Sequence, residues 1–233
     1  MNKEQFLNET KKLGINISDD ALSKLDEYYH LLIEENKKYN LTAITEEKSV
    51  YLKHFYDSLC IIKIINLDNQ YLLDIGTGAG FPGLVLKIVF QNLKIDLLDS
   101  TNKKCQFLQM VIDKLCLKNI SVINARAEEY AKVNREKYDI VTSRAVAPLK
   151  HLLEYSIPTL KSNGTFISLK SNLAEELTNI NNYYQKLYLS NEEIIKYELP
   201  YEHSLRTLYK VTKIKSTPIM YPRMYSQIKK KDI

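Results

Sequence analysis

The chain has 233 residues, of which 45% are hydrophobic and 26% charged, with a net charge of +5, values ordinary for a soluble globular protein. The first residues are polar and the longest apolar run, LCIIKIINL, contains Lys63, so we expect neither a secretory leader nor a membrane span. The three cysteines lack CxxC spacing, which indicates buried free thiols in a reducing cytoplasm and no metal site.

The first seventy residues have the periodicity of helices. Apolar residues recur at helical spacing through 18–40, where Ser18 is placed to cap the helix N-terminus and Asn40 is expected to be a cap or turn residue. A second helical stretch is expected from about residue 46 to 65. We therefore predict a helical N-terminal extension over residues 1–66.

From residue 71 onward, short apolar runs alternate with helical segments, which is typical of α/β proteins. The expected strands are 71–76, 93–99, 120–124, 138–143, 164–170, 192–199 and 206–214. The expected helices are 82–91, 101–117, 148–160 and 172–188. Residues 67–233 are thus predicted to form a Rossmann-like domain with a mostly parallel seven-stranded sheet, whose last two strands make an antiparallel edge hairpin.

Four of the six glycines fall within eight residues of the stretch LLDIGTGAGFPG, directly after the first expected strand: Gly76, Gly78, Gly80 and Gly83. A tight turn alone needs one glycine, so the cluster predicts a site where the backbone approaches a ligand closely. Part of the cluster also fits GxGxxG, and a nicotinamide or flavin cofactor therefore stays open at this point.

Acidic residues near this turn indicate the kind of ligand. Asp74 is poorly placed for a pyrophosphate, but it suits the cationic end of S-adenosylmethionine, either directly, through water or by fixing the loop. Asp99 ends the second strand, where an acid can accept hydrogen bonds from the ribose of either cofactor class. Ala127 and Glu128 follow the third strand and could border an adenine; a charged surface loop is the alternative.

Six segments of the chain resemble one known family, the bacterial 16S rRNA guanine-N7 methyltransferases, also called glucose-inhibited division protein B. They are YNLTAI (39–44), KHFYDSL (53–59), LLDIGTGAGFPG (72–83), LLDS (97–100), TSRAVAPL (142–149) and YPR (221–223). The resemblance implies a class I S-adenosylmethionine-dependent methyltransferase that modifies a guanosine in the decoding region of 16S rRNA. The chain departs from the family at LKS (169–171) and in the tail after YPR.

The resemblance also implies the residues of the site. Carried over by motif, the cofactor positions are Gly76, Phe81, Asp99, Ser100, Ala127, Glu128 and Arg144. With the residues argued above, the predicted cofactor set also includes Asp74, Gly78 and Gly80. We expect a cytoplasmic monomer that acts on 16S rRNA or on a small-subunit assembly intermediate.

Arg144, at the end of the fourth expected strand, is the catalytic candidate. Its guanidinium could pair with the methionine carboxylate, stack on the target base or bond to guanine O6; a salt bridge to Asp139 or Glu154 is the alternative. Guanine N7 carries a lone pair and no proton, so its methylation requires alignment rather than a general base. The [N/D]PP[Y/F] element of amine methylation is absent here, where the chain reads TSRAVAP.

Basic residues are candidates for RNA contact. The segment from residue 206 to the end has eight basic residues and one acidic residue, a net of +7, against −2 for the rest of the chain. Arg206 and Arg223 are predicted to contact phosphates, unless this segment is a solvated tail. Lys53, His54 and Lys170 are assigned to RNA contact or site closure, although a lone histidine such as His54 more often packs at an interface without a functional role.

Two alternative functions stay open from the sequence. One is a nicotinamide-dependent oxidoreductase, which would explain the glycines and Asp99 but gives Asp74 and the basic end no role. The other is a class I methyltransferase with a substrate other than rRNA.

Overall fold

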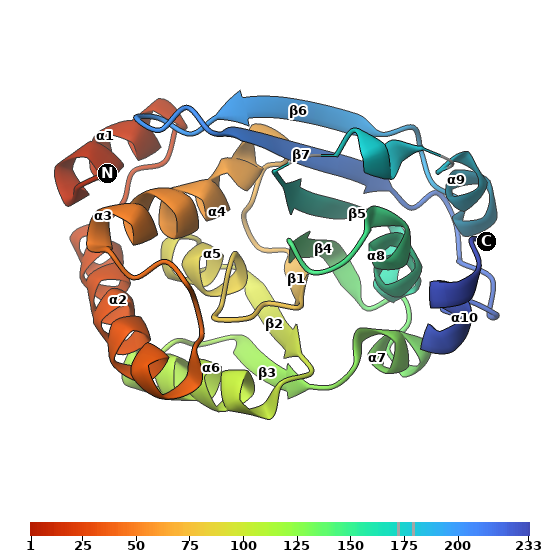
Figure 1. Ribbon diagram of the computed structural model, residues 1–233, viewed down its shortest axis with the longest axis horizontal. Helices are drawn as coiled ribbons and strands as arrows, with labels where there is room; N and C mark the ends of the chain where they lie inside the picture. Colours follow the sequence, from red (N-terminus) through yellow and green to blue (C-terminus); the bar gives the residue numbers. More distant parts are fainter. Residues whose placement is uncertain (172, 179) are drawn as a thin grey trace.

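The computed structural model describes residues 1–171, 173–178 and 180–233. Within these residues the sheet has seven strands in the order β3-β2-β1-β4-β5-β7-β6 (Figure 1). The strands are β1 (Tyr71–Ile75), β2 (Lys94–Asp99), β3 (Ile120–Asn124), β4 (Tyr138–Arg144), β5 (Leu160–Lys170), β6 (Glu193–Glu198) and β7 (Leu205–Thr212). The first five pair in parallel, and β7 runs antiparallel to both β5 and β6. The predicted hairpin is confirmed, with β6 at the edge.

Ten α-helical segments accompany the sheet in the described part of the chain. They are α1 (Lys3–Lys12), α2 (Asp19–Tyr39), α3 (Glu47–Val50), α4 (Asp57–Leu59), α5 (Gly83–Val89), α6 (Asn102–Lys114), α7 (Ala127–Val133), α8 (Leu149–Ser156), α9 (Asn181–Leu187) and α10 (Tyr225–Lys230). Ser18 caps α2 by accepting a hydrogen bond from the amide of Ala21, and Asn40 is the C-cap of that helix, so both residues are caps as expected. Asn40 adopts the left-handed conformation. None of these helices is long and apolar enough to cross a membrane.

Several helices differ from the expectation. The predicted helix 46–65 consists of α3, a π-helical stretch (Tyr51–Tyr56), α4 and a 3₁₀ turn (Cys60–Lys63). The predicted helix 172–188 is confirmed only as a 3₁₀ turn over 175–177 and as α9, while positions 172 and 179 lie outside the described residues. Neither α7 nor α10 was expected, because both are short and depend on tertiary contacts rather than on long periodicity.

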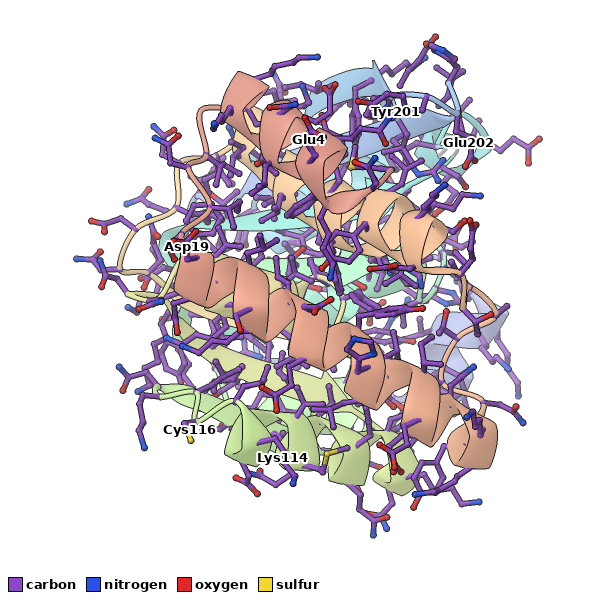
Figure 2. The ribbon with its side chains drawn as sticks, turned by 90° about the vertical axis from the view of Figure 1, so that its left-hand side faces the viewer. Glu4, Asp19, Lys114, Cys116, Tyr201 and Glu202 are labelled. Atoms are coloured by element: carbon purple, nitrogen blue, oxygen red, sulfur yellow. The ribbon has the colours of Figure 1, made fainter. Side chains whose placement is uncertain are left out.

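The sheet separates two apolar cores. Leu72 and Leu73 are neighbours on β1, yet they belong to different clusters because successive strand residues point to opposite faces. The first cluster joins the N-terminal helices to α5 and α6 through buried residues such as Tyr28 and Phe107. Figure 2 shows α2, which begins at Asp19, lying alongside α6, whose Lys114 is labelled. The helical extension therefore shares a core with the sheet, and the boundary at residue 66 stays a prediction.

The cysteines follow the expectation only in part. All three are free, and Cys60 and Cys105 are buried as predicted. Cys116 is exposed instead, because it follows α6 in a left-handed turn on the surface (Figure 2).

Candidate active site

The glycine-rich turn joins β1 to α5 and is tightly packed. Gly76 has φ +66°, and a Cβ there would lie 2.5 Å from the side chain of Val146. Its amide donates to the carbonyl of Leu98, which ties the turn to the end of β2. Only glycine combines this conformation with this close approach, so position 76 requires glycine.

A cavity of about 960 Å³ lies over this turn, at the carboxyl ends of the parallel strands. It is where the strand order reverses around β1 and β4, the usual ligand position in open α/β sheets. The predicted cofactor residues that line it are Gly76, Gly78, Phe81, Asp99, Ser100, Ala127, Glu128 and Arg144. The predicted RNA-contact residues that line it are Lys53, His54, Lys170 and Arg206.

Three predicted site residues do not line the cavity: Asp74, Gly80 and Arg223. Asp74 is fully buried beneath the turn, where one carboxylate oxygen accepts the amide of Gly83 at 2.8 Å. Burial raises the pKa of Asp74 to about 6, against the opposing effects of Thr77 and the Gly83 amide. Of the roles considered for Asp74, the structure therefore supports fixing the loop rather than direct contact with a ligand.

Asp99 lies at the cavity wall with both carboxylate oxygens in use. One oxygen accepts the amide of Gly78 at 3.0 Å and the other accepts the amide of Thr101 at 2.8 Å. A carboxylate offers about four acceptor positions, so these bonds leave capacity for a ligand hydroxyl. Asp99 thus fixes the glycine turn and can still bind a ribose.

The wall near Ala127 is stabilised by an ion pair. Glu128 is buried, and its carboxylate accepts the Nε of Arg126 at 3.0 Å. The Arg126 guanidinium in turn lies 4.8 Å from the ring centroid of Tyr225, a residue of the C-terminal helix. No local signal in the sequence places this tyrosine here, because it lies about a hundred residues beyond the third strand.

Arg144 joins the sheet to the helical extension. Its guanidinium donates to the carbonyl of Lys53 at 2.9 Å and to Nδ1 of His54 at 3.0 Å. It also lies 3.5 Å from a carboxylate oxygen of Asp57 and 5.0 Å from the ring centroid of Phe81. The alternative salt bridges to Asp139 and Glu154 are not formed, since those carboxylates pair with Lys161 and Arg223.

The contacts of His54 determine its protonation. A guanidinium has only donors, so Nδ1 of His54 must accept from Arg144 and the ring must be neutral. The ring proton then sits on Nε2, which lies 2.9 Å from the hydroxyl of Thr42. The ring also stacks on Phe81 with a centroid distance of 4.2 Å. Burial, reinforced by the positive charge of Arg144, lowers the pKa of His54 to about 3.

The carboxylate of Asp57 lies near two arginines in the cavity wall. Asp57 lies 3.5 Å from Arg144 and 3.6 Å from Arg206, and it accepts the hydroxyl of Tyr197 at 2.7 Å. Two guanidiniums thus share a single buried carboxylate, which leaves this part of the wall positively charged. Asp57 belongs to the KHFYDSL segment, on helical turns close to Lys53 and His54, but its distant arginine partners give no local signal in the sequence.

Like Lys53 and Arg206, which pair with Glu202 and Asp57, the predicted RNA-contact residues Lys170 and Arg223 have acidic partners. The Lys170 ammonium lies within 2.9 Å of both carboxylate oxygens of Glu176 and donates to the carbonyl of Ala147. Arg223 donates to the fully buried Glu154 through Nε and Nη2, each at 2.8 Å. These pairs anchor a loop through Lys170 and the C-terminal tail through Arg223, while the contact of either residue with RNA stays a prediction.

Some basic side chains of the C-terminal segment, residues 206–233, are buried or paired with acidic residues, so they are not all available to a ligand. Lys213 is fully buried between Glu136 and the carbonyl of Leu160. Lys210 pairs with Glu193. A fully solvated tail is therefore the wrong description, because β7 and the anchored α10 take up much of this segment.

Comparison with known proteins identifies the family. The sequence model of rRNA small subunit methyltransferase G (GidB) matches residues 21–205. The chain belongs to this family. The ribosomal RNA small subunit methyltransferase G of Mesoplasma florum is 49% identical over 221 residues, 94% of this chain and 92% of that protein. The protein of the same name from Acetivibrio thermocellus is 45% identical, over 90% of this chain and 88% of its own length.

Solved structures support the fold class. A SAM-dependent methyltransferase from Aquifex aeolicus superposes with a TM-score of 0.55 at 16% identity, covering 78% of this chain and 98% of that chain. A precorrin-6y C5,15-methyltransferase from Geobacter metallireducens gives a TM-score of 0.55 at 16% identity, covering 72% and 89%. At such identities the likeness concerns the fold alone, and it confirms the predicted class I methyltransferase architecture.

Proposed function

We propose that this protein transfers a methyl group from S-adenosylmethionine to N7 of a guanosine in 16S rRNA. The substrate class, small-subunit rRNA, follows from membership of the family. The observation that supports the chemistry is that the glycine turn, Asp99, Arg144 and Arg206 all line the same cavity.

The residues of the turn fit a nucleoside without a phosphate. A dinucleotide-binding turn would offer its backbone amides to a pyrophosphate. Here the amides of Gly78 and Gly83 donate to Asp99 and Asp74, and both carboxylates would repel a phosphate. This arrangement favours S-adenosylmethionine, held at Asp99 and Ala127, over a nicotinamide cofactor. When bound, the cofactor supplies an electrophilic methyl group on its sulfonium.

The residues around the cavity fit a methyl transfer that needs no general base to remove a proton. Guanine N7 has a lone pair to donate, so the protein has only to align it, which can contribute about 7–11 kcal/mol to lowering the barrier. Both nitrogens of His54 are occupied by Arg144 and Thr42, and the ring is not available to take a proton. Arg144 carries further N–H groups that can bond to guanine O6 in the cavity.

Lys53 and Arg206 are two basic residues of the cavity wall that we propose meet the RNA backbone. Both line the cavity, and their acidic partners Glu202 and Asp57 hold them in position. Contacts of this kind attract phosphates without reading sequence and weaken as salt rises. We propose a monomer that acts in the cytoplasm on the rRNA or on a small-subunit assembly intermediate.

The deciding experiment is transfer of tritium from labelled S-adenosylmethionine to small-subunit rRNA that lacks the modification, followed by base analysis. Naked 16S rRNA and partly assembled subunits are tested side by side. Label in 7-methylguanosine supports the proposal, whereas label in another base or none in either substrate overturns it. Calorimetry with S-adenosylhomocysteine and with NADH tests the oxidoreductase alternative, which predicts binding of NADH alone.

A further inference from the structure

The C-terminal helix is fixed beside the cavity although it lies outside the residues matched by the family, 21–205. Figure 1 shows α10 next to α7 and α8. Arg223, just before the helix, holds the fully buried Glu154 on α8 through its side chain and its main-chain amide. Ile228 of α10 is only 1% exposed. The helix is therefore a packed part of the cavity region, and its side chains have defined positions there.

Tyr225, the first residue of α10, lines the cavity together with Arg126, Ala127 and Glu128. The Arg126 guanidinium lies 4.8 Å from the tyrosine ring centroid and is itself held by the buried Glu128. The ring is thus placed by the same residues that border the proposed adenine position. Lys229 of the same helix lies 5.0 Å from the ring centroid, and Tyr225 is 38% exposed, so part of the residue stays open toward the cavity.

We propose that Tyr225 is a donor-positioning residue, whose ring packs against the adenine of the bound nucleoside from the C-terminal side of the cavity. The inference rests on the proposed function, because it takes S-adenosylmethionine as the ligand. Aromatic side chains bind bases through their π-faces with little demand on sequence or hydrogen bonding. Removal of such a contact costs roughly 5- to 150-fold in affinity.

The test is calorimetric titration of S-adenosylhomocysteine into the wild type, Tyr225→Ala, Tyr225→Leu and Tyr225→Phe. The alanine and leucine variants should bind at least roughly fivefold more weakly, whereas the phenylalanine variant should stay near the wild type because it keeps the ring. The leucine variant also fills the same space, so it separates the aromatic face from simple bulk.

Adenosine itself is the second probe. It has the base and lacks the amino-acid end, so Tyr225→Ala should weaken adenosine binding by the same factor as S-adenosylhomocysteine binding. The matched control is Tyr201→Ala, at a tyrosine 52% exposed that does not line the cavity and lies near Glu202 and α1 (Figure 2). This control should bind both probes like the wild type.

The outcomes separate this inference from the proposed function. If the wild type does not bind S-adenosylhomocysteine, the proposed function fails. If the wild type binds it and Tyr225→Ala binds it equally well, the role of Tyr225 is refuted while the proposed function stands. Loss of affinity for an unmodified rRNA fragment, with donor affinity unchanged, would likewise refute it by placing Tyr225 at the RNA.

Discussion

The neutral state of His54 can be measured directly through the pH dependence of stability. The ring accepts from Arg144 through Nδ1, stacks on Phe81 and is 7% exposed. Protonation in the folded state would break the Arg144 hydrogen bond and place two positive charges side by side. The pKa of His54 is accordingly lowered from 6.5 to about 3, first by burial and then by Arg144.

The sign and size of the effect follow from these values. Above pH 6.5 the ring is neutral in both the folded and the unfolded chain, so His54 carries no penalty. As the pH falls from 6.5 toward 3, the unfolded chain binds a proton that the folded chain does not, and the free energy of unfolding decreases. At pH 5 this loss amounts to about 2 kcal/mol.

The assay is urea unfolding at pH 8 and pH 5, for the wild type and for His54→Gln, which can accept and donate hydrogen bonds but does not titrate. The drop in free energy of unfolding should be about 2 kcal/mol smaller in the variant. The pKa of Asp74 is raised to about 6, so protonation of Asp74 increases the free energy of unfolding as the pH falls. This contribution is common to both proteins and cancels in the difference. His30→Gln, at a side chain 71% exposed, supplies the baseline for losing an imidazole.

Equal pH dependence in the wild type and His54→Gln would refute the reasoning. It would mean that His54 can be charged in the folded protein and that its Nδ1 does not accept from Arg144.

Three further substitutions test the site. Arg144→Ala should reduce tritium transfer at least roughly tenfold, equivalent to ~1.4 kcal/mol, and should also lower the melting temperature, because the guanidinium ties β4 to the helical extension; unchanged turnover would remove Arg144 from the site. Asp99→Ala should weaken S-adenosylhomocysteine binding roughly tenfold or more in calorimetry, and equal affinity would exclude Asp99 as a ligand contact. Gly83→Ala would press a Cβ against Leu97 and within 2.8 Å of a carboxylate oxygen of Asp74. It should lower stability by about 1–3 kcal/mol in urea unfolding, and an unchanged midpoint would contradict the packing described.

The local features of this protein could be predicted from the sequence. The alternation of strands and helices, the N-cap at Ser18 and the cap at Asn40 depend on a few neighbouring residues, and all of them appear in the structure. The glycine turn and Asp99 could also be predicted, because parallel strands deliver their carboxyl ends to the same edge of a sheet. The caps depend on interactions within a few residues, whereas the glycine turn and Asp99 follow from the general geometry of a parallel sheet.

Long-range partners could not be predicted in this way. The partners of Arg144 lie about ninety residues earlier, on the helical extension, whereas nearby carboxylates such as Asp139 pair elsewhere. The sequence gives no sign that Arg223 is paired, whereas in the fold it forms an ion pair with Glu154. Charge counted along the sequence does not record which charges neutralise one another in the fold.

The sequence by itself therefore determined the class of fold, the position of the turn and the family. Only the tertiary structure decided that Asp74 supports the turn from below, that His54 is neutral and that Tyr225 returns to the cavity. The physical reason is that burial and long-range contact determine what a polar side chain does, and both arise only when distant segments pack together.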